Sequence, residues 1–340
     1  MKPGSNSLIP AALRALERWG VVVAFVLLFA ISTMKQGSDF VSFENFRNIL
    51  NSNAAVGILA VGMTFVIISA GIDLSVGSMV VLSAALGTLF MNELLAREWS
   101  DLSAVLLGGA VTITAGLIAG SVNGALVVLG RLAPFIATLG GLAAFRSVAL
   151  ALADAGEIRS QSEGLFATIG RGGIPLFGLT NSADKPLTLT YSTVIFFAVA
   201  VVAQWFLSRT RFGRQLVAVG ANETAARYAG VSVAWVRFRV YALMGALAGV
   251  AGLVQSSRMN SVSTAQLGLG SELDAIAAVV IGGTSLRGGY GRVWGTVVGV
   301  LILGMITNIL TISGVSPYWQ GAVKGAVIVL AVLVQRGSRD

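Results

Sequence analysis

The sequence predicts an all-α membrane protein that crosses the bilayer about ten times. Charged residues are only 11% of its 340 residues, against roughly 25% in soluble domains, while 55% are apolar and the mean hydropathy is +0.84. Because a soluble fold needs polar groups to cover its surface, this composition excludes soluble enzymes, disordered proteins and nucleic-acid-binding domains. The apolar runs are continuous, which favours helices over the alternating strands of an outer-membrane barrel.

The predicted spans follow one another along the whole chain. A helix needs about 20 residues to cross a hydrocarbon core about 30 Å thick. The longest polar stretch, 153–188, is too short for a core of its own, so residues 1–340 are predicted to form a single transmembrane domain. The ten apolar runs lie at about 19–34, 54–71, 76–94, 103–129, 133–152, 189–208, 240–257, 273–286, 293–312 and 318–335.

Charge on the connections predicts the orientation of the chain. Loops rich in Lys and Arg stay in the cytoplasm, and segment 209–239 carries six Arg against the single acid Glu223. An even number of spans puts the basic ends 1–18 and 336–340 on the same cytoplasmic side. Segment 153–188 is nearly neutral and is expected to be periplasmic. The six arginines are Arg209, Arg211, Arg214, Arg227, Arg237 and Arg239.

Two residue types are missing from the chain. It has no Cys, which excludes disulfides and thiol chemistry, and no His, which removes the commonest zinc ligand and the usual proton shuttle. The phosphate-binding motif Gly-x-x-x-x-Gly-Lys-Ser/Thr does not occur either. We therefore expect no catalytic site, metal or cofactor here. If ATP drives the protein, ATP and Mg²⁺ bind a separate ATPase chain.

The hydrophobic pattern is interrupted twice in a similar way. Segments 67–78 (IISAGIDLSVGS) and 280–292 (VIGGTSLRGGYGR) each place Gly, hydroxyl and charged residues between two apolar runs. Gly lets the backbone turn, and Ser, Thr and Asp can satisfy freed peptide groups. Paired interruptions in two halves of a chain are typical of transporters built from an internal repeat. The alternative is two ordinary cytoplasmic turns between helices.

Five polar residues could line a translocation path or stabilise these interruptions: Ser69, Asp73, Ser75, Asn123 and Thr284. A carboxylate in lipid costs about 2.5–3.5 kcal/mol on insertion scales, so Asp73 is expected to face a partner or a cavity. It either caps the helix that starts near Ser75 or contributes to a polar path. Asn123 lies within a predicted span, where it could bond a neighbouring helix or contact substrate.

Three charged residues at the ends of other runs have simpler predicted roles. Glu272 and Asp274 open the run at 273–286, where negative charge suits a helix N-terminus, and both are expected to cap it. Arg146 lies inside the run at 133–152 and either extends to an interface or pairs with an acid.

Glycines repeat at four-residue intervals in two predicted spans. Gly116, Gly120 and Gly124 form one series, and Gly245 and Gly249 form the other. This spacing puts the glycines on one helix face and predicts close packing between helices.

The loop at 209–239 also contains a predicted short helix. Either Asn222 or Thr224 can cap its N-terminus, and Gly230 can end it. Its small residues, which include Ala225 and Ala226, would let a partner surface approach closely.

Three segments carry a resemblance to a known family. They are 57–78 (GILAVGMTFVIISAGIDLSVGS), 213–230 (GRQLVAVGANETAARYAG) and 275–291 (AIAAVVIGGTSLRGGYG). The chain resembles the permease subunits of ribose/xylose-type ATP-binding-cassette (ABC) sugar importers, within the type II binding-protein-dependent permeases, from about Asn45 to Arg336.

The resemblance implies partners and site residues. A periplasmic or lipid-anchored binding protein delivers the sugar, two permease subunits form the path as a homo- or heterodimer, and ATP-binding subunits dock beneath. Thr224 stands where other importers have Glu in the motif Glu-Ala-Ala-x-x-x-Gly. The residues expected in the ATPase-coupling loop are Arg214, Gly220, Asn222, Ala225, Ala226 and Gly230.

We therefore expect a non-catalytic permease subunit of the bacterial inner membrane that passes a monosaccharide such as ribose or xylose. A neutral polyol needs no fixed charge along its path. Alternatives are the same machine for an autoinducer, inositol or a branched-chain amino acid. A stand-alone secondary transporter is a further alternative, with only Asp73, Glu272 and Asp274 as candidate ion ligands. A membrane enzyme would lack any acid–base cluster.

Overall fold

The computed structural model describes residues 37–180, 186–316 and 318–326, together with residues 26, 29–30, 32–34 and 329. Within these residues, seven helices are long and apolar enough to cross a membrane, which confirms the predicted all-α polytopic class. They are α3 (Phe43–Ile68), α4 (Val76–Ala96), α5 (Asp101–Val128), α6 (Pro134–Ala151), α8 (Tyr191–Arg209), α11 (Val233–Met259) and α13 (Val293–Ile312).

Three of the ten predicted spans have a different outcome. The run at 273–286 forms α12 (Ser271–Ile281), whose 11 residues extend only about 16 Å, so this helix is too short to cross a bilayer alone. It ends at Gly282, which is followed by Gly283 with φ +84°. The run at 19–34 lies largely outside the described residues and the run at 318–335 lies partly outside them, so the count of ten stays a prediction.

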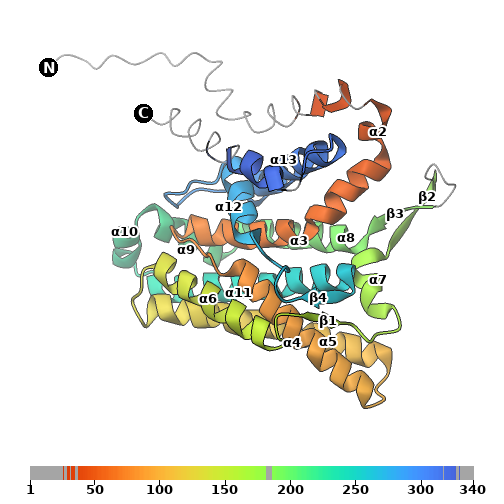
Figure 1. Ribbon diagram of the computed structural model, residues 1–340. Coiled ribbons are helices and arrows are strands. Elements are labelled where there is room, and N and C mark those ends of the chain that lie inside the picture. The colour runs from red at the N-terminus through yellow and green to blue at the C-terminus, as the bar shows by residue number, and fades with distance from the viewer. Residues whose placement is uncertain are drawn as a thin grey trace.

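Short elements gather at the two ends of the helix bundle, at the right and left of Figure 1. The predicted loop 153–188 contains β1 (Glu157–Arg159), α7 (Leu165–Arg171) and β2 (Gly173–Thr180), and β3 (Pro186–Thr190) follows. β1 pairs antiparallel with β4 (Ser261–Ser263), and β2 pairs antiparallel with β3. The opposite end carries α9 (Arg211–Ala221) and α10 (Glu223–Tyr228), while α2 (Ser38–Val41) precedes α3.

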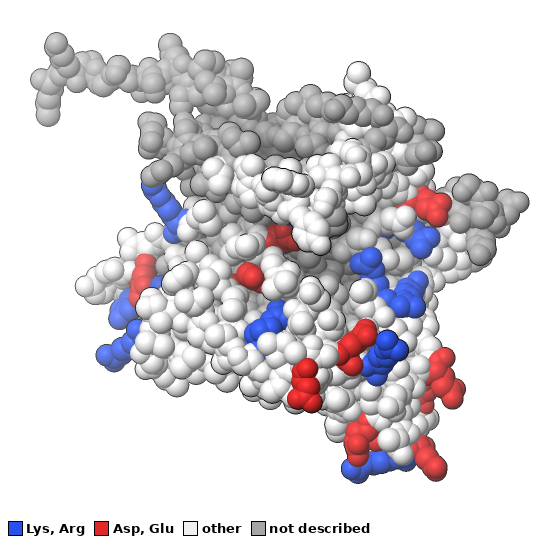
Figure 2. All heavy atoms as spheres, in the orientation of Figure 1, with Lys and Arg blue, Asp and Glu red and all other residues white. Residues whose placement is uncertain are grey.

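Charged side chains are sparse on the described surface. Figure 2 shows a face that is mostly uncharged, with many of its Lys, Arg, Asp and Glu residues toward the two ends of the bundle. Many large apolar side chains on the long helices are exposed, among them Leu106, Ile118 and Val202. A surface of this kind is stable in lipid, where apolar side chains have no water to avoid.

The two glycine series meet where α5 crosses α11, as their spacing predicted. A Cβ added to Gly116 would collide with the carbonyl oxygen of Gly245, and one added to Gly120 would collide with that of Tyr241. A Cβ added to Gly249 would lie 2.7 Å from the Cα of Ile113 on α5. The backbones therefore touch directly, because no side chain separates them.

Replacing Gly120 with valine is expected to lower the free energy of unfolding by about 2 kcal/mol, because the added carbons must push two helix backbones apart. Gly140→Val on α6 is the matched control, since nothing lies within 4 Å of its Cβ position. Thermal unfolding of the purified variants in detergent measures the difference. Equal midpoints for the two variants would contradict this packing.

Candidate functional site

The segment formed by α9 and α10 (Arg211–Tyr228) is held in shape by capping bonds. Thr210 Oγ1 accepts a hydrogen bond from the backbone N–H of Gly213 at 3.2 Å, and Asn222 Oδ1 accepts one from that of Ala225 at 2.9 Å. Of the two caps that the sequence allowed for the short helix, Asn222 is therefore the one used. Gly230, just beyond α10, has φ +79°, a conformation that suits glycine.

Glu223 ties α10 to the start of α11. Its carboxylate accepts hydrogen bonds from Arg227 at 2.8 Å and from Arg237 at 2.7 Å. Burial alone would raise the pKa of Glu223, but the charges and hydrogen bonds of the two arginines outweigh burial and hold that pKa below its ordinary value. The carboxylate is thus ionised at neutral pH and links the two helices.

The six residues expected in the coupling loop divide between two faces of this segment. Arg214, Asn222, Ala225 and Gly230 are exposed, whereas Ala226 is buried and Gly220 faces the bundle. The exposed side of α10 also presents Tyr228, which is 88% exposed. One side of the segment is therefore open to a partner, and the other is packed against the membrane helices. The contact of the six coupling-loop residues with an ATPase stays a prediction.

The two interruptions predicted from sequence are real breaks, and they touch each other. The first break (residues 69–75) separates α3 from α4, and the second break (residues 282–292) separates α12 from α13. The backbone N–H of Gly289 in the second break donates to the carbonyl oxygen of Ile68 at 2.9 Å. A Cβ on Gly288 would lie 2.9 Å from Ala70. Segments more than 200 residues apart are thus joined through their backbones.

The end of α9 rests on this junction. A Cβ added to Gly220 would collide with the carbonyl oxygen of Ile68 and would lie 2.6 Å from the backbone nitrogen of Gly289. A Cβ on Gly289 would itself lie 2.6 Å from Ala221. Since only glycine allows so close an approach, the α9–α10 segment and both breaks are packed directly against one another.

Three of the five predicted polar residues form one buried cluster. Asp73 is fully buried, and its Oδ1 accepts hydrogen bonds from the backbone N–H of Ser75 at 2.9 Å and from Ser75 Oγ at 2.6 Å. Asn123 on α5 donates from Nδ2 to Ser75 Oγ at 2.7 Å. Asp73 therefore accepts the N–H of Ser75, the N-cap residue of α4, but among the described residues no side chain caps α4 itself, so the capping interpretation is not confirmed. Asn123 makes the expected bond to a neighbouring segment.

The other two polar residues lie outside this cluster. Ser69 Oγ donates to the carbonyl oxygen of Val66 at 2.6 Å and so satisfies the end of its own helix. Thr284 is buried in the second break, and its Oγ1 has no hydrogen-bond partner among the described residues. The hydrogen bonds therefore do not unite the five into a single site.

Sequence reasoning missed some residues at these sites. Tyr241 on α11 is buried, and its hydroxyl would lie 2.7 Å from a Cβ on Gly71, beside the Asp73 cluster. Gln204 on α8 accepts a hydrogen bond from the backbone N–H of Val293 at 3.1 Å, which holds the end of the second break. A lone polar side chain in an apolar run was the available signal for both, but it does not reveal the partner.

The charged residues at the run ends behave differently from expectation. No side chain caps α12: its N-cap is Gly270, and Asp274 instead forms an ion pair with Lys324 at 3.0 Å. The capping predictions for Glu272 and Asp274 are therefore wrong, because Gly270 occupies the N-cap position; both acids instead lie in the first turn, where the helix dipole favours negative charge. Arg146 donates to the carbonyl oxygens of Thr264 and Leu267 at 3.1 and 2.9 Å, and it also interacts electrostatically with Glu272, without forming an ion pair with it.

The chain belongs to the family described as "Branched-chain amino acid transport system / permease component", whose sequence model matches residues 45–332. It is 38% identical to the ribose import permease protein RbsC of Escherichia coli (strain K12), over 94% of this chain and 93% of that protein. It is 39% identical to RbsC of Bacillus subtilis (strain 168), with 92% and 90% covered, and 32% identical to the xylose transport system permease protein XylH of Haemophilus influenzae, with 95% and 97% covered.

Proposed function

We propose that the chain is the permease subunit of an ABC importer and carries a monosaccharide such as ribose or xylose across the bacterial inner membrane. The observation that carries this proposal is the α9–α10 segment, whose outer face is open and whose inner face is packed on both helix breaks. The relatives with sugar names support the choice of substrate class, since they match nearly the full length of this chain.

The geometry supports a route for mechanical coupling. A separate ATPase would hold the exposed side of α10, and its movement would pass through Gly220 to the junction of Ile68 and Gly289. Both breaks would then shift together, and with them the helices that they connect. Such a junction suits alternating access, in which packed elements exchange between two arrangements. The chain itself would hydrolyse nothing.

We propose a complex of two permease subunits, ATPase subunits and a periplasmic or lipid-anchored sugar-binding protein. The α9–α10 end, with the basic ends of the chain, would face the cytoplasm, and the end with β1 to β4 would face the periplasm. Amino acid import, named in the family description, is the second candidate. The relatives with sugar names favour the sugar. The scarcity of charged residues in the spans supports the same choice, because a neutral polyol needs no charged binding group in the path.

Transport by reconstituted proteoliposomes tests the proposal. With its ATPase and binding protein, the chain is expected to accumulate radiolabelled ribose or xylose only when ATP is present. The chain alone is expected to accumulate no sugar, with or without a proton or sodium gradient. Accumulation by the isolated chain on an ion gradient would contradict the proposal and favour a secondary transporter. Accumulation of leucine in place of sugar would favour the second candidate.

A further inference from the structure

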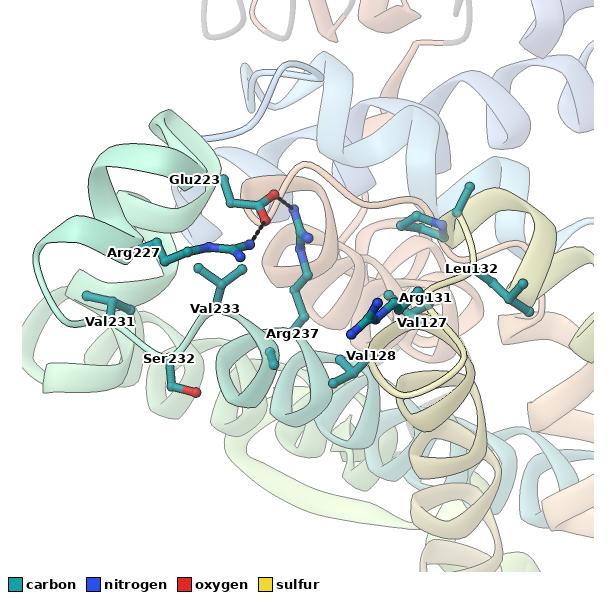
Figure 3. Close-up of a pocket in the computed structure, with 13 residues that line it drawn as sticks. Val127, Val128, Arg131, Leu132, Glu223, Arg227, Val231, Ser232, Val233 and Arg237 are labelled. Carbon is teal, nitrogen blue, oxygen red and sulfur yellow. Dashed lines mark hydrogen bonds and ion pairs between the residues drawn. The ribbon is translucent and has the colours of Figure 1, made fainter.

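A pocket of about 960 Å³ lies beside the α9–α10 segment, and the Glu223 ion pairs form part of its lining. It is formed by the end of α5, the connection from α5 to α6, α10 and the start of α11 (Figure 3). Apolar side chains such as Val127, Leu132 and Val233 line much of it. The pocket therefore combines an apolar wall with the polar residues of the bundle end.

Positive charge is in excess in this pocket. Arg131, Arg227 and Arg237 line it against the single acid Glu223. Figure 3 shows the Glu223 carboxylate between Arg227 and Arg237, which both bind it. Arg131 is exposed and forms no ion pair with any described residue. A ligand with negative charge would complete this arrangement, because one acid cannot neutralise three guanidinium groups.

The pocket lies at the level where the membrane surface is expected. Trp235 and Phe238, on the same turns of α11 as Arg237, stack with ring centroids 5.4 Å apart, and the Arg239 guanidinium lies 4.7 Å from the centroid of the Trp235 ring. Trp235 is 51% exposed. Exposed Trp next to Arg is typical of the headgroup layer.

Exposed apolar side chains flank the same place. Leu129 is 80% exposed, and Leu126, Leu132 and Phe135 are also exposed, on the end of α5 and the start of α6. A soluble anion such as inorganic phosphate would gain nothing from this apolar surface. A ligand with both a phosphate and hydrocarbon chains would match both parts.

We propose that this pocket binds the phosphodiester headgroup of an anionic phospholipid. Arg131 contacts the phosphate directly, and Glu223 holds the guanidinium groups of Arg227 and Arg237 so that their remaining N–H groups face the same oxygens. The acyl chains lie along Leu129 and Phe135. The bound lipid links the α5–α6 connection to α10 and α11, and so supports the α9–α10 segment.

The test uses the full chain purified in detergent, with dioleoylphosphatidylglycerol added as the anionic lipid. The lipid is expected to raise the thermal unfolding temperature and to remain bound in native mass spectrometry, whereas dioleoylphosphatidylcholine does neither. Arg131→Gln is expected to raise the half-saturating lipid concentration about tenfold, because one charge-assisted hydrogen-bonding partner is lost. Arg211→Gln is the matched control: it is an exposed arginine at the same end that does not line the pocket.

Four results would overturn this inference. Equal lipid binding by the two variants would exclude Arg131 from the site, and equal stabilisation by both lipids would exclude headgroup recognition. Equal stabilisation by inorganic phosphate would make the pocket a site for soluble anions. If Arg131→Gln leaves lipid binding intact but abolishes association with the ATPase, the pocket is a protein-docking surface. None of these results depends on which solute the chain transports.

Discussion

Replacing Gly220 with valine is expected to separate ATP hydrolysis from transport. The new side chain must collide with the carbonyl oxygen of Ile68, so the end of α9 moves off the junction of the two breaks. In the assembled importer, we expect sugar uptake to fall at least about tenfold, since overpacking of this kind costs roughly 1–3 kcal/mol. ATP hydrolysis should stay within about twofold of the original rate, because the exposed face of α10 is unchanged.

Both rates are measured on the same proteoliposomes. The number of ATP molecules consumed per sugar transported shows whether hydrolysis and transport are uncoupled. Gly220→Ala is a milder variant that adds only a Cβ, which already collides with Ile68. We expect it to lose less sugar uptake than Gly220→Val. Ala218→Val controls for a β-branched residue in α9, since Ala218 is exposed. Thermal unfolding of each purified permease shows that it is folded. An unchanged ratio in Gly220→Val would show that this contact carries no coupling.

Replacing Asp73 with alanine is expected to destabilise the permease more than it alters its choice of solute. The substitution removes the acceptor of two buried donors, the N–H and Oγ–H of Ser75. Each buried donor left unsatisfied costs about 1–3 kcal/mol, so we expect a loss of about 3 kcal/mol in the free energy of unfolding. The start of α4 and the bond from Asn123 should loosen as well.

Asp73→Asn is the matched variant, because its amide oxygen can still accept from Ser75. We expect it to recover much of the stability that alanine loses. Unfolding in detergent and the yield of membrane-inserted protein measure the effect, and competition by other sugars measures selectivity. If Asp73→Ala is as stable as the original chain but changes selectivity, Asp73 lines the translocation path instead of holding the break together.

The sequence predicted the helical elements well, because lipid imposes a simple rule. Apolar runs of about 20 residues predict spanning helices, and seven of them were confirmed within the described residues. The rule failed at 273–286, where hydropathy continued but Gly282 and Gly283 ended the helix. The glycine spacing also predicted a helix contact correctly, because a stripe of glycines on each helix lets the two backbones approach closely.

Other predictions depended on facts that a single sequence does not contain. The cap at Asn222 was one of two open choices, and the geometry of the turn decided between them. The pairing of Asp274 with Lys324 joins residues far apart in the chain and could not be read from the run in which Asp274 lies. Tyr241 had no visible partner in the sequence because its neighbours come from the first break.

Composition and the order of apolar and polar residues were enough by themselves to determine the class of protein, most spanning helices and the position of both breaks. These properties are local, because each segment that enters the lipid must satisfy its own backbone hydrogen bonds and present apolar side chains, independently of the other segments. Only the tertiary structure decided that the two breaks touch, that Gly220 rests on their junction and that three arginines surround one pocket. Such contacts join distant segments, and the close packing that selects them depends on the shapes of all the helices together.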